Sequence, residues 1–263
     1  MTDLQIVIPC GVNSSKYLEF LVDSIVKNTP KFKLLIGVKN KCLPKATIKS
    51  VESKVKDVEF IDVDCKFGTT SAGHGFMLDT LCKNLECEYT CFFDCDTALL
   101  HPDWFNILSK ELKGDNICIG SEYDGKKYYN FPNVIFCLFK TKEFKSLGIS
   151  FAPGGNHIVT EEDYNIFGRK KGDEIFLDVG WEFPYKTLKA GYNGISLPLI
   201  SPRIPETVKD LKFMEPDMRG EEHQYKSIPI VTHVGRSSSR QFEDPIVTRW
   251  VERVNQWADQ MDT

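Results

Sequence analysis

Long apolar runs and an excess of basic charge are both missing from this 263-residue sequence, whose formal charge is −4. No stretch approaches the roughly 20 apolar residues that a membrane-spanning helix needs, so we expect no transmembrane segment. The first nine residues carry an early acid and only a strand-length apolar run, unlike a signal peptide. Recognition of nucleic acid through bulk charge is not expected either.

Cysteine is missing from the chain after residue 137, because all nine cysteines lie between Cys10 and Cys137. No two of them show the Cys-x-x-Cys spacing typical of zinc sites, and an odd count does not suit a complete disulfide framework. Several, including Cys91 and Cys118, stand in apolar runs, where a thiol packs as a small hydrophobe. These features favour a reducing compartment, and we expect a cytoplasmic protein.

Strand-like apolar runs alternate with segments of helical periodicity over the first 121 residues. Strands that are apolar almost throughout, separated by helices, predict an α/β fold with a mostly parallel central sheet flanked by helices. The composition, 41% hydrophobic and 27% charged, suits one large domain. The expected strands are 6–8, 33–38, 58–63, 89–93 and 117–120, and the expected helices 16–26, 46–56, 75–84 and 104–113.

Beyond residue 121 the alternation loosens. The stretch 201–227, with three prolines and many charges, predicts a functional lid or a mobile segment. A helix over 176–190 would have a possible break at Pro184 and a C-cap at Gly191. We also expect strands at 133–139, 195–200 and 228–234, a loop-like insertion at 151–171 and a final amphipathic helix at 245–261.

Two carboxylates one residue apart, Asp94 and Asp96, directly follow the apolar run 89–93. Ligands of open α/β sheets bind beyond the carboxyl ends of the strands, and carboxylates are the ligands that Mg²⁺ and Mn²⁺ prefer. The pair therefore suggests a metal–diphosphate site, although an Asp-x-Asp tripeptide also occurs in solvated turns. The first strand ends at Pro9, and the turn-prone residues up to Asn13 suit either a nucleotide contact or a plain turn.

Five short elements follow one another along the chain: residues 6–9 (IVIP), 73–79 (GHGFMLD), 92–97 (FFDCDT), 102–104 (PDW) and 189–192 (KAGY). In this order they resemble those of nucleotide-sugar-dependent glycosyltransferases of the GT-A fold, in particular the inverting family 2. The resemblance implies a Rossmann-like GT-A fold and metal-dependent transfer of a sugar from a UDP- or GDP-sugar to a hydroxyl of a saccharide or glycan acceptor, with inversion. It also implies Mn²⁺ or Mg²⁺ on the acid pair, with Asp96 as the stronger ligand and Asp94 as the helper.

A single GT-A domain over residues 1–263 is implied, with a nucleotide-sugar-binding half at 1–121, an acceptor-binding half at 122–200 and a C-terminal lid, arm and helix at 201–263. The family usually places acidic or amide residues after the second strand to read the base. Lys39 and Asn40 stand there instead, so the recognised base stays open.

Two histidines and two arginines are further candidates. His74 precedes a helix and is a possible donor contact, or an exposed loop residue. His233 follows a strand, and the resemblance implies that a late histidine joins the acid pair on the metal. Arg236 and Arg240 could bind the diphosphate through paired hydrogen bonds, although a polar surface loop would look the same.

An inverting transfer also needs a base within hydrogen-bond reach of the acceptor hydroxyl. Asp178 and Glu182 stand four residues apart, which would place them on one helix face. We favour Asp178, at an expected helix start facing the cleft, and keep Glu182 as the alternative.

Two other functions stay open. A nucleotidyltransferase on a related α/β fold would also use metal and carboxylates, but residues 10–16 are a poor version of its glycine-rich basic loop. A catalytically inactive sugar- or nucleotide-binding scaffold is disfavoured by the intact acid pair.

Overall fold

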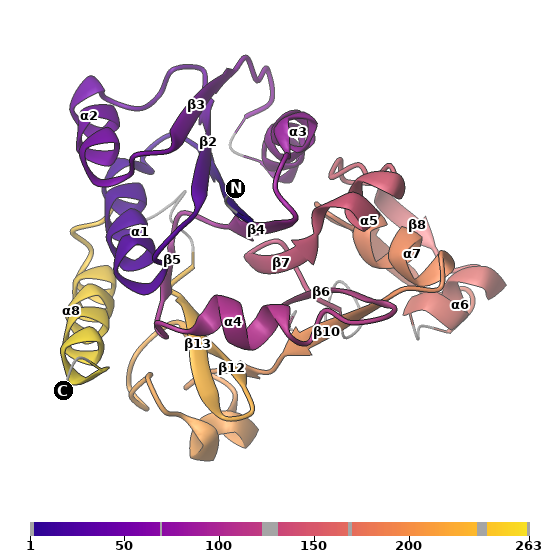
Figure 1. The fold of residues 1–263 in the computed structure, drawn as a ribbon. Coiled ribbons are helices and arrows are strands. Elements are labelled where there is room, and N and C mark those ends of the chain that lie inside the picture. Colours follow the sequence, from indigo (N-terminus) through magenta and orange to yellow (C-terminus); the bar gives the residue numbers. More distant parts are fainter. Residues whose placement is uncertain (1–2, 69, 123–130, 168–169, 236–240, 262–263) are drawn as a thin grey trace.

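The structure, a computed structural model, describes residues 3–68, 70–122, 131–167, 170–235 and 241–261. Within these ranges the chain forms a seven-stranded central sheet, a four-stranded sheet and a two-stranded sheet. The hairpin over residues 221–233, which belongs to the four-stranded sheet, lies apart from the first strands of the central sheet (Figure 1).

The central sheet has the strand order β10-β6-β7-β4-β1-β2-β3. Its strands pair in parallel, except that β7 runs antiparallel to both of its neighbours, β4 and β6. The predicted mostly parallel sheet is thus confirmed. The strands are β1 (Leu4–Cys10), β2 (Lys33–Lys39), β3 (Val58–Val63), β4 (Tyr89–Phe93), β6 (Asn116–Ser121), β7 (Phe136–Lys140) and β10 (Asn193–Leu197).

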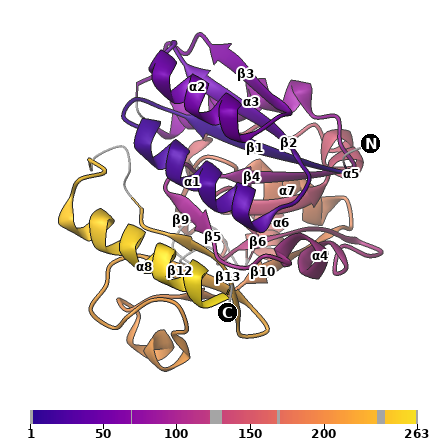
Figure 2. The ribbon, with the colours of Figure 1, turned by 60° about the vertical axis from the view of Figure 1, so that its left-hand side comes forward.

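Helices cover both faces of this sheet (Figures 1 and 2). The longest is the C-terminal helix, which coincides with the amphipathic segment expected from the sequence. The helices are α1 (Ser15–Asn28), α2 (Lys45–Lys54), α3 (Ser71–Leu81), α4 (Trp104–Ser109), α5 (Thr141–Ser146), α6 (Glu161–Phe167), α7 (Glu182–Lys189) and α8 (Pro245–Met261), with 3₁₀ turns η1 (Cys82–Asn84) and η2 (Pro205–Asp210).

Alternate side chains of β1 enter two separate cores. Ile6 and Ile8 pack in a cluster that includes buried residues of α1 and α8, whereas Val7 packs in a cluster with residues of α3, α5 and α7. Successive side chains of a strand point to opposite faces, so a sheet covered on both sides has strands that are apolar throughout. This explains the uninterrupted apolar runs in the sequence.

The C-terminal helix α8 returns the chain to α1, and the two lie side by side (Figure 2). The Trp250 ring meets the Phe20 ring edge-on, with centroids 5.3 Å apart. Lys27 Nζ donates to the Ala258 carbonyl oxygen at 3.2 Å, and Lys16 pairs with Glu243 just before the helix. The last segment of the chain is therefore part of the core beside the first βα unit.

The four-stranded sheet is antiparallel throughout, in the order β11-β12-β13-β5. Its edge strand β5 begins at Thr97, directly after the acid pair that follows β4. The chain thus passes from the central sheet to the smaller one within residues 94–96. The strands are β5 (Thr97–Leu99), β11 (Leu199–Ile200), β12 (Glu221–Tyr225) and β13 (Ile228–His233).

Two predictions for the middle of the chain are wrong. The expected loop at 151–171 contains a strand, β8 (Gly155–Ile158), and helix α6. The expected helix at 176–190 is in fact strand β9 (Glu174–Leu177), a turn and then α7, because Gly180 takes a left-handed φ of 78° that interrupts any helix there. β9 is stabilised by pairing with β8, a long-range contact that local periodicity does not reveal.

The bounds of α7 show how Pro184 and Gly191 affect this helix. Pro184 lies in the first turn of α7, where a missing N–H costs no helical hydrogen bond. Gly191 has a φ of 80° and donates its N–H to the Leu188 carbonyl at 3.0 Å, so the predicted helix stop is confirmed.

The segment 195–200 is two strands rather than one, because Pro198, which has no N–H, separates β10 from β11 and the two join different sheets. The stretch 201–227 holds η2 and β12. Phe213 and Met214 within it are buried in the core cluster shared with α1 and α8. Much of the expected lid is therefore built into the fold.

Among the described residues, no helix is both long and apolar enough to cross a bilayer. All nine cysteines are free thiols. Cys91 and Cys118 are fully buried in the central sheet, which confirms that they pack as small hydrophobic side chains.

A buried carboxylate fastens the 212–214 segment to β12. Glu222 is fully buried and accepts the backbone N–H groups of Lys212 (2.9 Å), Phe213 (2.7 Å) and Met214 (2.5 Å). Gln224 Nε2 adds a fourth hydrogen bond at 2.5 Å. A buried charge is tolerated when hydrogen bonds replace its hydration, and here they come from one short segment.

We expect Glu222→Ala to lower the free energy of unfolding by about 3–5 kcal/mol, because it leaves buried amides without an acceptor. Urea denaturation would measure the loss. The matched control is Glu52→Ala on the exposed side of α2, for which a change within about 0.5 kcal/mol is expected. Equal stability of the two variants would contradict this account of Glu222.

Candidate functional site

The acid pair lies at the junction of the two larger sheets. The Asp94 N–H donates to the Ile135 carbonyl oxygen at 2.9 Å, and the Asp94 carbonyl accepts the Thr97 hydroxyl at 2.6 Å. The Asp96 carbonyl accepts the Val234 N–H at 3.1 Å. The loop is thus bonded to a central-sheet segment on one side and to the end of β13 on the other.

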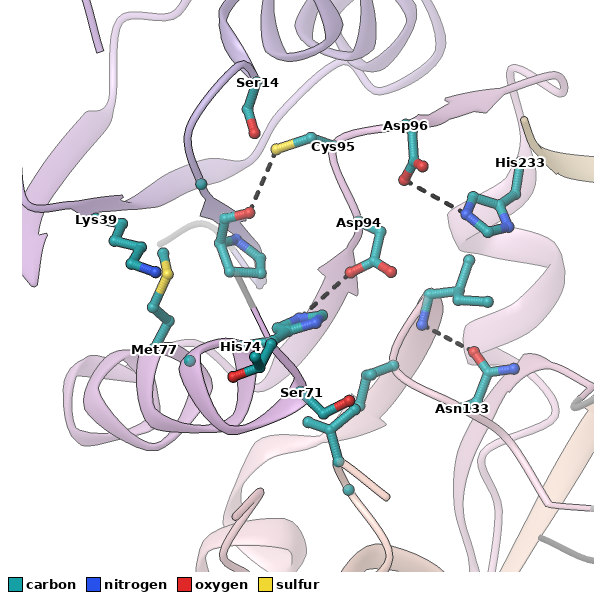
Figure 3. Close-up of a pocket in the computed structure, with 18 of the residues that line it drawn as sticks. Ser14, Lys39, Ser71, His74, Met77, Asp94, Cys95, Asp96, Asn133 and His233 are labelled. Atoms are coloured by element: carbon teal, nitrogen blue, oxygen red, sulfur yellow. Dashed lines mark hydrogen bonds and ion pairs between the residues drawn. The ribbon is translucent and has the colours of Figure 1, made fainter. Parts of the chain in front are cut away.

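The residue between the acids points away from them. Cys95 Sγ donates to the Pro9 carbonyl oxygen at 3.3 Å and lies 3.2 Å from Cys10 Sγ (Figure 3). The contact with Cys10 and burial raise the pKa of the Cys95 thiol well above its usual value, so the thiol keeps the proton that it donates. This bond holds the acid loop against the end of β1.

Strand pairing brings His233 to the acids. In the antiparallel ladder of β13 and β5, His233 is the register partner of Thr97, which directly follows Asp96. His233 Nε2 lies 3.4 Å from Asp96 Oδ1 (Figure 3). The predicted meeting of Asp94, Asp96 and His233 is found in the structure, where one ligand atom from each lies within 4.8 Å of the others.

These three groups perturb one another strongly because they are buried together. Burial raises the pKa of the Asp94 carboxyl, against the opposing effect of His74. Burial lowers the pKa of His233, but the Asp96 and Glu221 carboxylates outweigh it and raise that pKa well above its usual value. The cluster is thus an acidic site that attracts positive charge.

The donor set fits a hard divalent cation. His233 Nδ1 is 2.8 Å from Glu221 Oε1, which leaves Nε2 facing Asp96. The 3.4 Å between Nε2 and Asp96 Oδ1 is long for a hydrogen bond. It is close to the roughly 3 Å that separates neighbouring ligand atoms around an octahedral ion with bonds of about 2.1 Å. Two carboxylates and one imidazole suit Mn²⁺ or Mg²⁺.

The acids and His233 line one side of a cavity of about 400 Å³ at the carboxyl ends of β1 and β4 (Figure 3). Small and apolar side chains make up much of its remaining wall. The lining residues are Pro9, Gly11, Val12, Ser14, Lys39, Gly68, Thr70, Ser71, Gly73, His74, Met77, Asp94, Cys95, Asp96, Phe131, Pro132, Asn133, Val134, Ile135, Val179, Gly180, Phe183, Pro184 and His233.

Of the other residues predicted to bind the sugar donor, some line the cavity and others do not. Pro9 and His74 line the cavity, and His74 Nε2 lies 3.4 Å from Asp94 Oδ1. Asn13 is exposed in a turn with a left-handed φ of 71° and is not among the lining residues, although Val12 and Ser14 beside it are. Arg236 and Arg240 lie outside the described residues.

The two base candidates do not share a helix face, because α7 begins only at Glu182 and Asp178 precedes it in the turn. Asp178 is buried and, contrary to the prediction, is not among the lining residues, whereas the next two residues, Val179 and Gly180, are. The Glu182 carboxylate accepts the Ser150 N–H at 2.8 Å and pairs with Lys186 at 2.6 Å. Both contacts are made by the same oxygen, Oε2.

A short loop is hydrogen-bonded to both α3 and α7, which contribute residues to the cavity wall. Asp79 of α3 accepts the Ser150 hydroxyl at 3.0 Å and the Phe151 N–H at 2.7 Å, and so orients this loop. A side chain at Gly75 would place its Cβ 2.3 Å from the Phe151 carbonyl oxygen. Gly75 therefore permits the close approach of α3 to this loop.

Two further residues were not predicted as site residues. Glu221 would be recognised from the register opposite His233, but only once 221–225 is identified as a strand. Lys39 is only 7% exposed and lines the cavity, with Nζ 2.6 Å from the Gly68 carbonyl oxygen. The sequence feature that could have identified Lys39 is its position as a charged residue at the carboxyl end of the apolar strand β2.

No protein-family model matches the sequence, and a search of curated proteins finds no match either. Solved structures do match. A mannosyltransferase from Pyrobaculum calidifontis, PcManGT, in complex with GDP-Man and Mn²⁺, is 13% identical with a TM-score of 0.51, over 75% of this chain and 55% of its own. This chain thus spans little more than half of that enzyme.

The galactosyltransferase LgtC matches over nearly the whole chain. Its complex with donor and acceptor sugar analogues is 13% identical with a TM-score of 0.50, and an active-site mutant of LgtC is 12% identical with a TM-score of 0.53. Both cover 97% of this chain and 95% of LgtC. Likeness at this level of identity establishes the fold, and the chain has the GT-A fold of these glycosyltransferases.

Proposed function

We propose that this protein is a metal-dependent glycosyltransferase that moves a sugar from a nucleoside-diphosphate donor to a hydroxyl of a saccharide or glycan acceptor. The observation that carries the proposal is the convergence of Asp94, Asp96 and His233 on one side of a cavity. That cavity lies where open α/β sheets bind ligands. The similar mannosyltransferase was solved with a nucleotide sugar and Mn²⁺, which supports the same donor class here.

The chemistry follows from the charge of the leaving group. A nucleoside diphosphate departs with developing negative charge, which Mn²⁺ or Mg²⁺ bound at this site would stabilise. Asp96 and His233 are the residues proposed to hold the cation most directly, since their ligand atoms are 3.4 Å apart. Asp94, beside His74, is the proposed helper.

The donor would extend from the acids along the cavity toward Lys39. Figure 3 shows Lys39 across the cavity from Asp96 and His233, with His74 and Ser71 along the α3 side. This arrangement gives the cavity one acidic and one cationic region. Pro9 and the backbone at Gly11 would contact the nucleoside, and Arg236 and Arg240 remain proposed contacts of the diphosphate.

The proposed base is Asp178, with Glu182 as the alternative. Burial of Asp178 next to cavity-lining residues favours it, whereas the ion pair and the amide contact of Glu182 favour a structural role for that residue. Inversion of configuration is proposed together with this assignment, because an inverting transfer requires such a base.

The first test is a thermal-shift screen of UDP, GDP, CDP and ADP and their sugars with and without Mn²⁺. One base is expected to stabilise the protein only when Mn²⁺ is present, by about 2.7 kcal/mol at a hundredfold excess over Kd. Absence of any response would support an inactive scaffold. Release of pyrophosphate from a nucleoside triphosphate and a sugar phosphate would instead identify a nucleotidyltransferase.

Removal of the proposed ligands tests the metal site. We expect Asp96→Asn and His233→Ala to weaken Mn²⁺ binding by more than about 100-fold, as measured by calorimetry in the presence of the best nucleotide. The turnover rate of both variants should fall together with their Mn²⁺ affinity. Asp259→Asn, an exposed acid on α8, is the control with unchanged affinity. Wild-type Mn²⁺ affinity in His233→Ala would remove this histidine from the site.

Substitution of each candidate in turn tests which of the two is the base. Asp178→Asn is expected to lower kcat by about 100-fold or more while nucleotide affinity stays within twofold, because a general base acts only in the transfer step. Glu182→Gln should change kcat far less. NMR of the product would give its anomeric configuration. Full turnover by Asp178→Asn, or a retained configuration, would contradict the assignment.

A further inference from the structure

A second carboxylate lies directly behind the proposed metal ligand His233. In the antiparallel ladder of β12 and β13, Glu221 is the register partner of His233. Paired residues of neighbouring strands project to the same face of a sheet, so the two side chains meet on the face that carries the site. Glu221 Oε1 lies 2.8 Å from His233 Nδ1.

We propose that Glu221 is a positioning residue that fixes the tautomer and orientation of His233 for metal binding. The inference rests on the proposed metal site. A neutral imidazole can ligate through only one nitrogen, and the partner of the other nitrogen decides which. Glu221 accepts the Nδ1 hydrogen, so Nε2, which lies 3.4 Å from Asp96, is the nitrogen available to the metal once the cation displaces its proton.

The surroundings make this hydrogen bond strong and specific. The Glu221 and His233 side chains are each only 14% exposed, and a hydrogen bond is stronger in such a low-dielectric setting. A carboxylate acceptor also increases the basicity of the ligating nitrogen. Glu221 therefore acts on the metal through His233, without being a ligand itself.

A second buried histidine on β12 lies beside Glu221. His223 is fully buried on the same strand face as Glu221, with Nε2 3.6 Å from the same Oε1. The series His223, Glu221, His233 and Asp96 thus runs across β12 and β13 to the acid loop.

The experiment compares Mn²⁺ affinity among wild type, Glu221→Gln and Glu221→Ala by calorimetry, first with Mn²⁺ alone and then with the best nucleotide. We expect a 10- to 100-fold weaker Mn²⁺ Kd for Glu221→Ala. Glu221→Gln should lie between, because its amide oxygen still accepts the Nδ1 hydrogen but carries no charge. Nucleotide affinity without metal should stay within twofold in both variants.

A matched control removes a carboxylate that is paired elsewhere. Glu215→Ala loses an exposed ion pair with Arg249 and should keep wild-type Mn²⁺ affinity. Urea denaturation of the apo proteins shows whether each variant folds, and if Glu221→Ala does not, the isosteric Glu221→Gln decides. Mn²⁺ affinity within twofold of wild type in the folded Glu221 variants overturns the positioning role alone. Failure of the wild type to bind Mn²⁺ overturns the proposed metal site itself, and the role of Glu221 with it.

Discussion

The register of one antiparallel ladder determines the site. β13 pairs with β5 on one side and with β12 on the other, so that Thr97, His233 and Glu221 form one row across three strands. A slip of one residue would turn His233 to the opposite face, because side chains alternate along a strand. The position of the histidine relative to Asp96 therefore depends on backbone pairing between segments that are far apart in the sequence.

The acid loop is held from both sides because it belongs to neither sheet. Its flanking strands, β4 and β5, are built into different sheets, and Cys95 binds the end of β1 while the acids face the cavity. The same three residues thus supply a packed thiol on one side of the loop and two carboxylates on the other.

The sequence predicted the parts that depend on local pattern. The first strands, α1, α8 and the acid pair could be identified because apolar periodicity and strand ends are local signals, whereas the resemblance to the glycosyltransferase family implied the role of His233. β8 and β9, which were taken for loop and helix, are short and pair only with each other. Glu221 was missed for a related reason: β12 has polar residues buried by long-range contacts, such as Glu222 with its amides. Local composition carries no trace of those partners.

The loop at Ser150 and Phe151 has a consequence for motion. It is hydrogen-bonded to Asp79 of α3 and to Glu182 of α7, and Gly75 lets α3 pack against its backbone. Both helices contribute residues to the cavity wall. Because close-packed interiors transmit displacement, we expect α3 and α7 to move together and the cavity to widen on the side formed by other segments.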